Sequence, residues 1–324
     1  MSGRTLLTLA WRLGGRVPEG VVRAVGALVA DVTWFRHGTS VRRLESNLRH
    51  VRPWLSRRGL RALSRTGMRS YMRYYGEAFT LSSLTAAQLT ARVRTIGEDR
   101  LRGALVHGDR VVIALGHQGN WDLAGAWATQ NLASVTTVAE RLEPEEVFQE
   151  FLAFREGLGM TIFPLTGGRD VFRELLRAVG SGSEAGLVPL VADRDLTRRG
   201  IEVSLFGAPA RVAAGPAALA VSTGAPLFAA SIWYERLVGE RRRRAGSPWG
   251  IVVAFRPVET APESLSRAER VIVTTQAWVD EVAAGIAAHP EDWHMLQKVF
   301  VADLDPARDA DVATSVADGP GGVR

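Results

Sequence analysis

The sequence predicts a single α/β domain with a central, mainly parallel sheet flanked by helices. From about residue 110, short apolar runs alternate with longer segments of helical periodicity, as in a βαβα chain. The composition, 46% apolar and 23% charged, is that of a globular protein. The 324 residues can bury one large core, and we see neither an internal repeat nor an interdomain linker.

The elements follow in a regular order along the chain. The apolar run 110–116 ends in glycine, which is typical of a buried parallel strand, and β-branched residues favour a strand at 134–139. A proline in the first turn and glycines at the end predict a helix at 144–158. We expect further helices at 121–132, 170–179, 216–223 and 268–288, and further strands at 160–165, 187–192, 226–234 and 248–258. The last strand is expected antiparallel to 226–234, with the arginines 241–244 at an exposed hairpin tip.

The first 35 residues are expected to be membrane-association helices. Residues 5–35 form two short amphipathic segments with a break near Gly14 and Pro18. We expect no secretory signal, because the apolar run stops at Arg12 and no small-residue cleavage site follows. No run approaches about 18 consecutive apolar residues, so we expect no spanning helix. We assign residues 36–304 to the main domain, which includes the arginine-rich region 36–73, and expect 305–324 to be disordered.

An arginine-rich region follows the first 35 residues. Residues 36–73 contain eleven arginines and one acid, Glu45, in a chain of net charge +6. Five of these arginines recur every four residues, so that a helix would align them in one stripe: 57, 61, 65, 69 and 73. Such a stripe suits an anionic membrane surface. A solvated helix face and a nucleic-acid surface are the alternatives, although the sequence shows no nucleic-acid-binding motif.

Several classes of chemistry are excluded by what the sequence lacks. It has no cysteine, which rules out disulfides, zinc–thiolate sites, iron–sulfur clusters and cysteine nucleophiles. It also has no Gly-x-Ser-x-Gly elbow, no P-loop and no dinucleotide-binding glycine motif. Lys298 is its single lysine, so 39 of the 40 basic residues are arginines. We expect neither a metal nor a bound cofactor.

A candidate acid–base pair follows the strand predicted at 110–116. The sequence Gly116-His117-Gln118-Gly119-Asn120-Trp121-Asp122 places a histidine in a glycine-flanked turn, with a carboxylate five residues later. In an open α/β sheet the active site lies beyond the carboxyl ends of the strands. Asp122 could orient one imidazole nitrogen and leave the other to take a proton, although it could also simply cap a helix. Without a nucleophile or a metal, such a pair favours direct transfer of an acyl group to an alcohol.

These residues resemble the His-x4-Asp motif of glycerolipid and lipid A-type acyltransferases. Further blocks of sequence resemble the actinobacterial phosphatidylinositol mannoside acyltransferases, from about residue 5 to residue 304: Pro164-Leu-Thr-Gly-Gly168, Ala192-Asp-Arg-Asp-Leu-Thr197, Ala214-Gly-Pro-Ala-Ala-Leu219 and His289-Pro-Glu-Asp-Trp-His-Met-Leu-Gln297. The resemblance implies transfer of a fatty acyl group, typically palmitoyl, from acyl-CoA to a mannose hydroxyl of a phosphatidylinositol mannoside. It also implies peripheral attachment to the cytoplasmic face of the plasma membrane, and we expect a monomer.

The resemblance also assigns roles to individual residues. His117 would be the general base and Asp122 its partner, and Asp193 matches an acidic residue near the catalytic histidine where relatives carry glutamate. Arg155 and Arg199 match basic residues that would meet the donor phosphates or the acceptor, and Ser222 stands at a donor-contacting position where we expect glutamate in close relatives. The alternatives are an acyltransferase for another glycolipid or a lysophospholipid, and a non-catalytic lipid-binding protein of the same fold.

Overall fold

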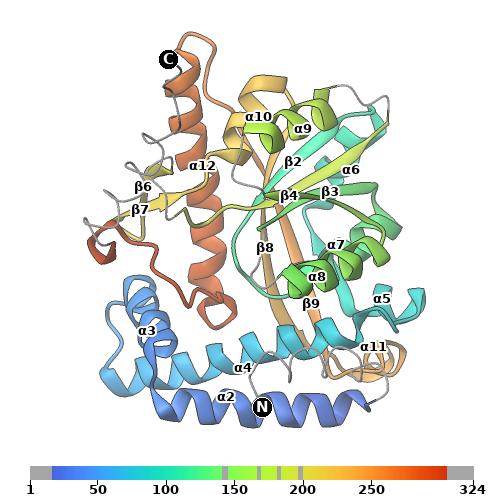
Figure 1. Cartoon of the computed structure of the whole chain (residues 1–324), viewed down its shortest axis with the longest axis vertical. Coiled ribbons are helices and arrows are strands. Elements are labelled where there is room, and N and C mark those ends of the chain that lie inside the picture. The colour runs from blue at the N-terminus through green and yellow to red at the C-terminus, as the bar shows by residue number, and fades with distance from the viewer. Residues whose placement is uncertain (1–16, 141–144, 166–168, 181–183, 196–199, 305–324) are drawn as a thin grey trace, which may run out of the picture.

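A seven-stranded sheet forms the centre of the computed structural model, which describes residues 17–140, 145–165, 169–180, 184–195 and 200–304 (Figure 1). Its strands, in spatial order, are β1 (Val93–Ile96), β9 (Trp249–Val258), β8 (Leu227–Arg236), β2 (Arg110–Leu115), β5 (Gly186–Val191), β3 (Ser134–Glu140) and β4 (Met160–Leu165). Five of them, from β8 to β4 in this order, are mutually parallel. β9 is antiparallel to β8, and β1 is parallel to β9. The predicted fold class is confirmed.

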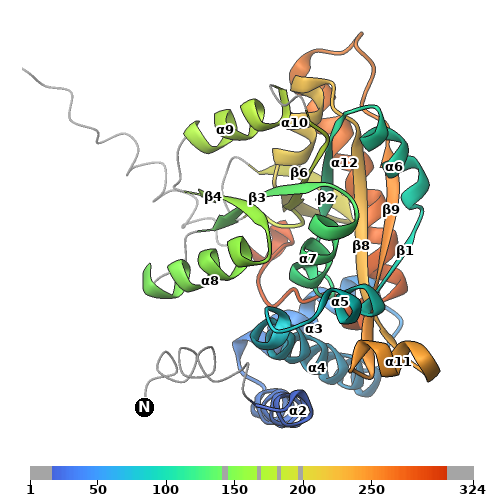
Figure 2. The ribbon, with the colours of Figure 1, turned by 90° about the vertical axis from the view of Figure 1, so that its right-hand side faces the viewer.

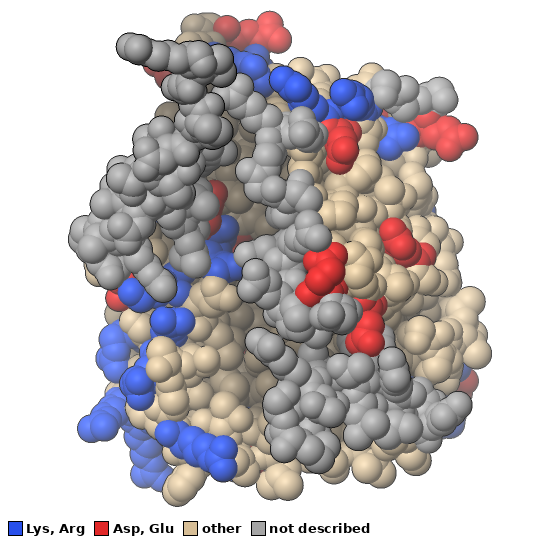
Figure 3. All heavy atoms as spheres, in the orientation of Figure 1, with Lys and Arg blue, Asp and Glu red and all other residues tan. Residues whose placement is uncertain are grey.

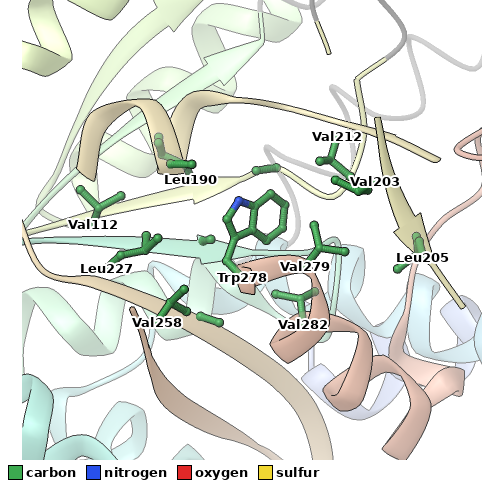
Figure 4. Close-up of a cluster of buried hydrophobic side chains, with 14 of the residues drawn as sticks. Val112, Leu190, Val203, Leu205, Val212, Leu227, Val258, Trp278, Val279 and Val282 are labelled. Atoms are coloured by element: carbon green, nitrogen blue, oxygen red, sulfur yellow. The ribbon is translucent and has the colours of Figure 1, made fainter. Parts of the chain in front are cut away.

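Helices cover both faces of this sheet (Figures 1 and 2). One face packs against α5 (Ala86–Arg92), α6 (Glu98–Val106), α7 (Trp121–Asn131) and α8 (Glu145–Gly157), and the other against α9 (Arg169–Gly180), α10 (Gly215–Thr223) and α12 (Arg267–Ala288). Alternate residues of β2 serve the two faces, because successive side chains of a strand point to opposite sides. Ile113 packs in the α7 layer, whereas Val112 packs with Trp278 of α12 in the cluster drawn in Figure 4.

The elements predicted from residue 110 onward are all present, with bounds that shift by at most two residues. Several elements were not predicted, among them α5, α6 and three strands. The edge strand β1 has only four residues, and β6 (Ile201–Leu205) and β7 (Ala208–Val212) form a separate antiparallel pair. The 241–244 segment lies, as expected, in the connection between the antiparallel strands β8 and β9, where it forms a short helix, α11 (Gly239–Ala245). Its last three arginines are exposed as expected, but Arg241 binds the Ala91 carbonyl and Glu235.

Three helices close one end of the sheet: α2 (Glu19–Arg36), α3 (Thr39–Val51) and α4 (Arg57–Leu81). α2 and α4 lie side by side in both views (Figures 1 and 2). α2 begins directly after Pro18, where a break was expected. The first of the two predicted N-terminal helices and the predicted disordered tail lie outside the described residues. A small apolar cluster joins the three helices and includes Ala30, Leu48 and Met68.

The arginine stripe does form on α4, but its contacts correct the expected role. Arg61 binds Glu45 at 2.8 Å and lies over the ring of Trp34. Arg65 and Arg69 both donate hydrogen bonds to the two carboxylate oxygens of Asp31 on α2. Arg73 lies over the ring of Trp249, 3.7 Å from its centroid. Four of the five arginines are therefore used within the protein, because acids and aromatic rings distant in the sequence come to lie beside α4. This stripe is not a free cationic face.

By length and composition, α12 could cross a bilayer, the single such helix in the part of the chain that the structure describes. Its inner side, however, carries Trp278, Val279 and Val282 into the core beneath the sheet (Figure 4). α12 is therefore a core helix of the domain.

Candidate active site

The site is built on a tight turn between β2 and α7. Asn120 caps α7, since its side-chain oxygen accepts the Leu123 N–H at 2.9 Å. Gly119 has φ +56°, and a Cβ there would lie 2.7 Å from a methyl of Ile232. A Cβ at Gly116 would lie 2.9 Å from Asp193 Oδ2. Both glycines are therefore needed for the turn to lie so close to its neighbours.

His117, in this turn, pairs with Asp193. The parallel pairing of β2 and β5 places Leu115 opposite Val191, so the residues two positions beyond each strand also come together. His117 Nδ1 lies 2.6 Å from Asp193 Oδ1, and the His117 backbone N–H donates to Asp193 Oδ2 at 3.0 Å. The His117 side chain is 30% exposed and that of Asp193 only 4%. With Nδ1 held by the carboxylate, Nε2 is the ring nitrogen left to exchange a proton.

The environment of Asp193 keeps its carboxylate charged. Burial disfavours the ionised form, but the charge and hydrogen bonds of His117 outweigh this effect, and the indole N–H of Trp293 adds to them. The pKa of Asp193 is therefore lowered from its usual value. A buried, ionised carboxylate against Nδ1 both orients an imidazole and stabilises its protonated form. The pair is therefore suited to general acid–base chemistry.

Asp122 does not take the predicted place beside His117. It lies in the first turn of α7, almost fully buried, where its Oδ1 accepts from Arg155 Nε at 2.8 Å and its Oδ2 from the Tyr74 hydroxyl at 2.8 Å. Burial opposes the charge of Arg155, but the charge of Asp122 prevails and raises the pKa of Arg155. The sequence spacing suggested Asp122 because it is near His117 along the chain. The sheet register instead brings Asp193 to the imidazole.

The other predicted site residues have different fates. Ser222 lies near the end of α10, just before β8 begins, where its hydroxyl binds the Ala218 carbonyl and Arg267. Since β8 is parallel to β2, Ser222 lies at the opposite end of the sheet from His117, so the structure does not bring it to this site. Arg199 lies outside the described residues. Within those residues, no group of three or more His, Asp or Glu side chains is placed to hold a metal ion.

An apolar cavity opens beside the turn, between α7 and the sheet. The space within it is about 760 Å³, part of which is open to solvent. Asp122 and Arg155 line it as polar groups. The remaining lining is mostly apolar and crosses the sheet from β9 to β4, including Phe255, Ile232, Leu115, Pro189 and Met160.

The sequence profile of the bacterial lipid A biosynthesis acyltransferases matches residues 3–301. The chain belongs to this family. Two curated relatives are named phosphatidylinositol mannoside acyltransferase. The protein from Mycolicibacterium smegmatis is 38% identical over 305 residues, which cover 94% of this chain and 93% of the relative. The protein from Mycobacterium tuberculosis (strain CDC 1551 / Oshkosh) is 42% identical over 246 residues, covering 75% and 72%. The resemblance expected from the sequence motifs is confirmed, and the chain is an acyltransferase.

The candidate site also contains residues of α4 that sequence reasoning missed. The Glu77 carboxylate accepts from Asn120 Nδ2 at 2.7 Å and from the Tyr234 hydroxyl at 3.0 Å, and Tyr74 holds Asp122. Burial is the main reason that the pKa of Glu77 is raised. Ser70, Tyr74 and Glu77 follow each other at helical spacing and are all buried. Polar residues recurring on one helix face were the available signal, but the regular arginines of the same helix obscured it.

The segment after α12 packs against the turn that carries His117. Gln118 and Trp293 are paired in an antiparallel bridge, with the His294 N–H donating to the His117 carbonyl at 2.7 Å and the Gly119 N–H to the Asp292 carbonyl at 2.9 Å. The sequence block 289–297 had been noted for its resemblance alone. Its role depends on contacts across more than 170 residues of chain, which no local pattern reveals.

Proposed function

We propose that this acyltransferase moves a fatty acyl group from acyl-CoA to a mannose hydroxyl of a phosphatidylinositol mannoside, with His117 as the general base. The observation that carries the proposal is the His117–Asp193 pair, which leaves Nε2 unengaged by Asp193 beside an apolar cavity. The names of the two relatives support the choice of acceptor.

The chemistry follows from the orientation of the imidazole. Nε2 of His117 takes the hydroxyl proton as the acceptor oxygen attacks the thioester carbonyl, forming the new C–O bond. Asp193 stabilises the imidazolium through Nδ1. Collapse of the tetrahedral intermediate breaks the C–S bond, and the imidazolium returns its proton to the departing CoA sulfur. Atoms and charge then balance without a covalent acyl-enzyme.

The cavity would hold the acyl chain. Its lining is mostly aliphatic and aromatic, and burial of each CH₂ contributes about 0.8 kcal/mol. The ion pair of Asp122 and Arg155 lies at the polar part of the lining, and Trp121 joins it to the turn that carries His117. A chain lying in the cavity would thus have its thioester end toward this turn. We keep Arg155 as a candidate contact for the donor or acceptor.

Attachment to the inner face of the plasma membrane would come from the outer side of α2. Five of its apolar residues recur at helical spacing and are exposed: Val21, Val25, Leu28, Val32 and Phe35. Leu28 is 64% exposed and Phe35 80%. Figure 3 shows basic side chains gathered over the region of α3 and the start of α4. The end of α2 and these two segments carry the exposed arginines Arg36, Arg42, Arg43, Arg57 and Arg58. These exposed arginines, in place of the stripe on α4, would meet anionic lipid headgroups.

The test is to incubate the purified protein with palmitoyl-CoA and a panel of acceptors and to identify products by mass spectrometry. The panel contains phosphatidylinositol mannosides, another glycolipid and a lysophospholipid. His117→Ala should lose most turnover, whereas His107→Ala, which removes an exposed histidine of the α6–β2 turn, should retain it. A folded His117→Ala protein within tenfold of wild type would exclude His117 as the base. Acylation of a different acceptor would support the proposed reaction but replace the proposed acceptor. If no acceptor were acylated, the result would favour a lipid-binding protein.

A further inference from the structure

Among the described residues two tryptophans, Trp278 and Trp293, are completely buried, and their indole N–H groups differ in one respect. Trp293 Nε1 donates to Asp193 Oδ2 at 2.8 Å. Trp278 Nε1 has no hydrogen-bond partner among the described residues, although its ring lies in the core cluster of Figure 4. A buried N–H is normally paired, because leaving it unpaired costs free energy. The contact at Trp293 is therefore a specific interaction with the carboxylate behind His117.

The two oxygens of the Asp193 carboxylate have separate partners. Oδ2 accepts two hydrogen bonds, one from the Trp293 indole and one from the His117 backbone N–H at 3.0 Å. Oδ1 lies against His117 Nδ1 at 2.6 Å. Two donors from different segments fix Oδ2, and this fixes the plane in which Oδ1 meets the imidazole. Charge-assisted hydrogen bonds of this kind are short and directional.

Trp293 itself is held by the turn that carries the histidine. The bridge between Gln118 and Trp293 fixes its backbone, and two flanking hydrogen bonds join Gly119 to Asp292 and His294 to His117. The ring of Phe206 packs edge-on against the indole, with centroids 6.0 Å apart. Histidine, carboxylate and indole therefore form one closed unit, although they come from three distant parts of the sequence.

We propose that Trp293 is a positioning residue of this acyltransferase, whose indole N–H orients the Asp193 carboxylate toward His117 and withdraws part of its negative charge. The inference rests on the proposed role of His117 as the base. Trp293 and His117 both donate hydrogen bonds to the same carboxylate. The hydrogen bond from the indole therefore weakens the stabilisation that Asp193 gives to the protonated imidazole of His117. The base then releases its proton to the leaving group more readily.

Other charged or titratable groups lie on the elements packed around His117 and must be held constant in any test. His294 is neutral, because burial, the largest cause, lowers its pKa to about 3. Burial raises the pKa of Asp292 to about 6. Further groups on these elements are Arg73, Tyr74, Glu77 and the tyrosines 71 and 75 on α4, Tyr234 on β8, Asp122 on α7 with its partner Arg155, Glu291 beside Asp292, and Arg194 and Asp195 after Asp193. A change at Trp293 that leaves all of these in place isolates the indole contact.

The experiment compares Trp293→Phe with Trp278→Phe. Each removes one buried indole N–H and a similar volume, but the first alone breaks a hydrogen bond to Asp193. We expect Trp293→Phe to lower kcat about threefold to tenfold with KM for palmitoyl-CoA unchanged, and to move the acid limb of the kcat profile to higher pH. The NMR titration of the His117 ring, identified by its absence in His117→Ala, should move in the same direction. Trp278→Phe should leave both titrations at the wild-type position.

The outcomes separate this inference from the function on which it rests. If His117→Ala is inactive while the titration and kcat of Trp293→Phe match wild type, the positioning role is wrong and the base assignment survives. If His117→Ala remains active, the base assignment itself is wrong, and the NMR titration still decides whether the indole acts on His117. Should Trp293→Phe fail to fold, benzothienylalanine at position 293 keeps the ring shape and lacks only the N–H. The same shift is then required, and its absence overturns the proposal.

Discussion

The Asp122 carboxylate and the Arg155 guanidinium form an ion pair inside the protein, with Oδ1 and Nε 2.8 Å apart. Tyr74 completes the shell of the carboxylate from α4. The pair joins the first turn of α7 to α8 at the polar end of the apolar cavity. Its first consequence is structural, because a buried charge that loses its partner is costly.

Asp122→Asn should therefore act mainly on stability. It leaves the Arg155 charge buried without a counter-charge, which we expect to lower the free energy of unfolding by about 3–5 kcal/mol. Urea denaturation monitored by circular dichroism measures this loss. Asp193→Asn is the matched comparison, since it also neutralises a buried aspartate of the site. A stability of Asp122→Asn equal to wild type would contradict the burial argument.

Asp193→Asn should act mainly on turnover. Its amide cannot stabilise the imidazolium of His117 as the carboxylate does, and we expect kcat to fall about 10²–10⁴-fold. The rate measured against pH separates this effect from unfolding, because kcat should stay low across the range over which the variant remains folded. If Asp122→Asn instead showed the larger loss of kcat at unchanged stability, the assignment of partners in the site would have to be exchanged.

Gly125 and Met160 should set the length of the acyl chain. A Cβ on Gly125 would lie 2.7 Å from Met160 Sδ, and Met160 lines the cavity. Gly125→Ala therefore displaces the flexible Met160 side chain into the space that an acyl chain would use. We expect the longest acyl-CoA accepted to become shorter by about one to three carbons, as measured across a series of acyl-CoA donors.

The control for Gly125→Ala is Gly103→Ala. Gly103 lies in α6, where nothing would lie within 4 Å of an added Cβ. The Gly103→Ala substitution should leave the range of accepted acyl-chain lengths unchanged. An unaltered profile in Gly125→Ala, with the protein folded, would place the acyl chain elsewhere.

Leu28→Glu should weaken binding to anionic vesicles by more than tenfold. Burial of a leucine side chain contributes about 1.5–3 kcal/mol, and a factor of ten corresponds to about 1.4 kcal/mol. Vesicle sedimentation at low and high salt measures the change. Val106→Glu is the control, since Val106 is 85% exposed on α6, away from α2 (Figure 1). Equal losses in both variants would indicate a general effect of added negative charge and not a membrane-binding face on α2.

His294→Gln should make the protein less sensitive to mild acid. Burial lowers the pKa of His294 to about 3, so the folded state favours the neutral ring. Its stabilising contribution is complete above the ordinary value of 6.5 and is lost as the pH falls from 6.5 toward 3, at most on the order of 5 kcal/mol. The variant lacks this pH-dependent contribution of His294. The free energy of unfolding of the wild type, relative to that of the variant, should therefore increase from pH 4 to pH 6.5.

Asp292 contributes with the opposite sign in nearly the same range. Its pKa is raised from 3.8 to about 6 by burial, so its proton stabilises the fold and that stabilisation declines as the pH rises from 3.8 through 6. In His294→Gln this term remains, and stability should fall slightly between pH 4 and pH 6. Urea titrations at pH 4, 5, 6 and 7 test both signs, with His107→Gln as an exposed control. A constant difference between wild type and His294→Gln across this range would show that His294 does not titrate in the folded protein as inferred.

The sequence was most informative where structure is local. Apolar runs and glycine or proline boundaries located most strands and helices from residue 110 onward, with β6, β7 and α11 as the exceptions, because these patterns depend on neighbours in the chain. β1 escaped because four edge residues carry little pattern. The turn around His117 was found in the same way. Asp193 was included through resemblance alone, and its contact with His117 depends on the register between β2 and β5.

The contacts of charged residues were predicted less well than the positions of apolar strands and helices. The stripe on α4 was real, but Asp31 and Glu45, which neutralise much of it, occur singly in segments without an acidic pattern. Asp122 was assigned to His117 for a related reason, since the competing partner Arg155 lies 33 residues away. Periodicity reveals which face a charge occupies on its own helix. It does not reveal what lies opposite.

Helix α4 has consequences for which acceptors can be reached. It packs against α2 along one side, and on another side Tyr74 and Glu77 hold Asp122 and Asn120 beside the turn that carries His117. If α2 rests on the lipid, the imidazole is kept at a fixed height above the bilayer, with one helix layer of about 8–10 Å intervening. A hydroxyl can react only if its headgroup is tall enough to span that gap. The enzyme would thus select glycolipids by the height of their headgroup above the bilayer. A headgroup with too few sugars would not react, even if it carried a chemically suitable hydroxyl.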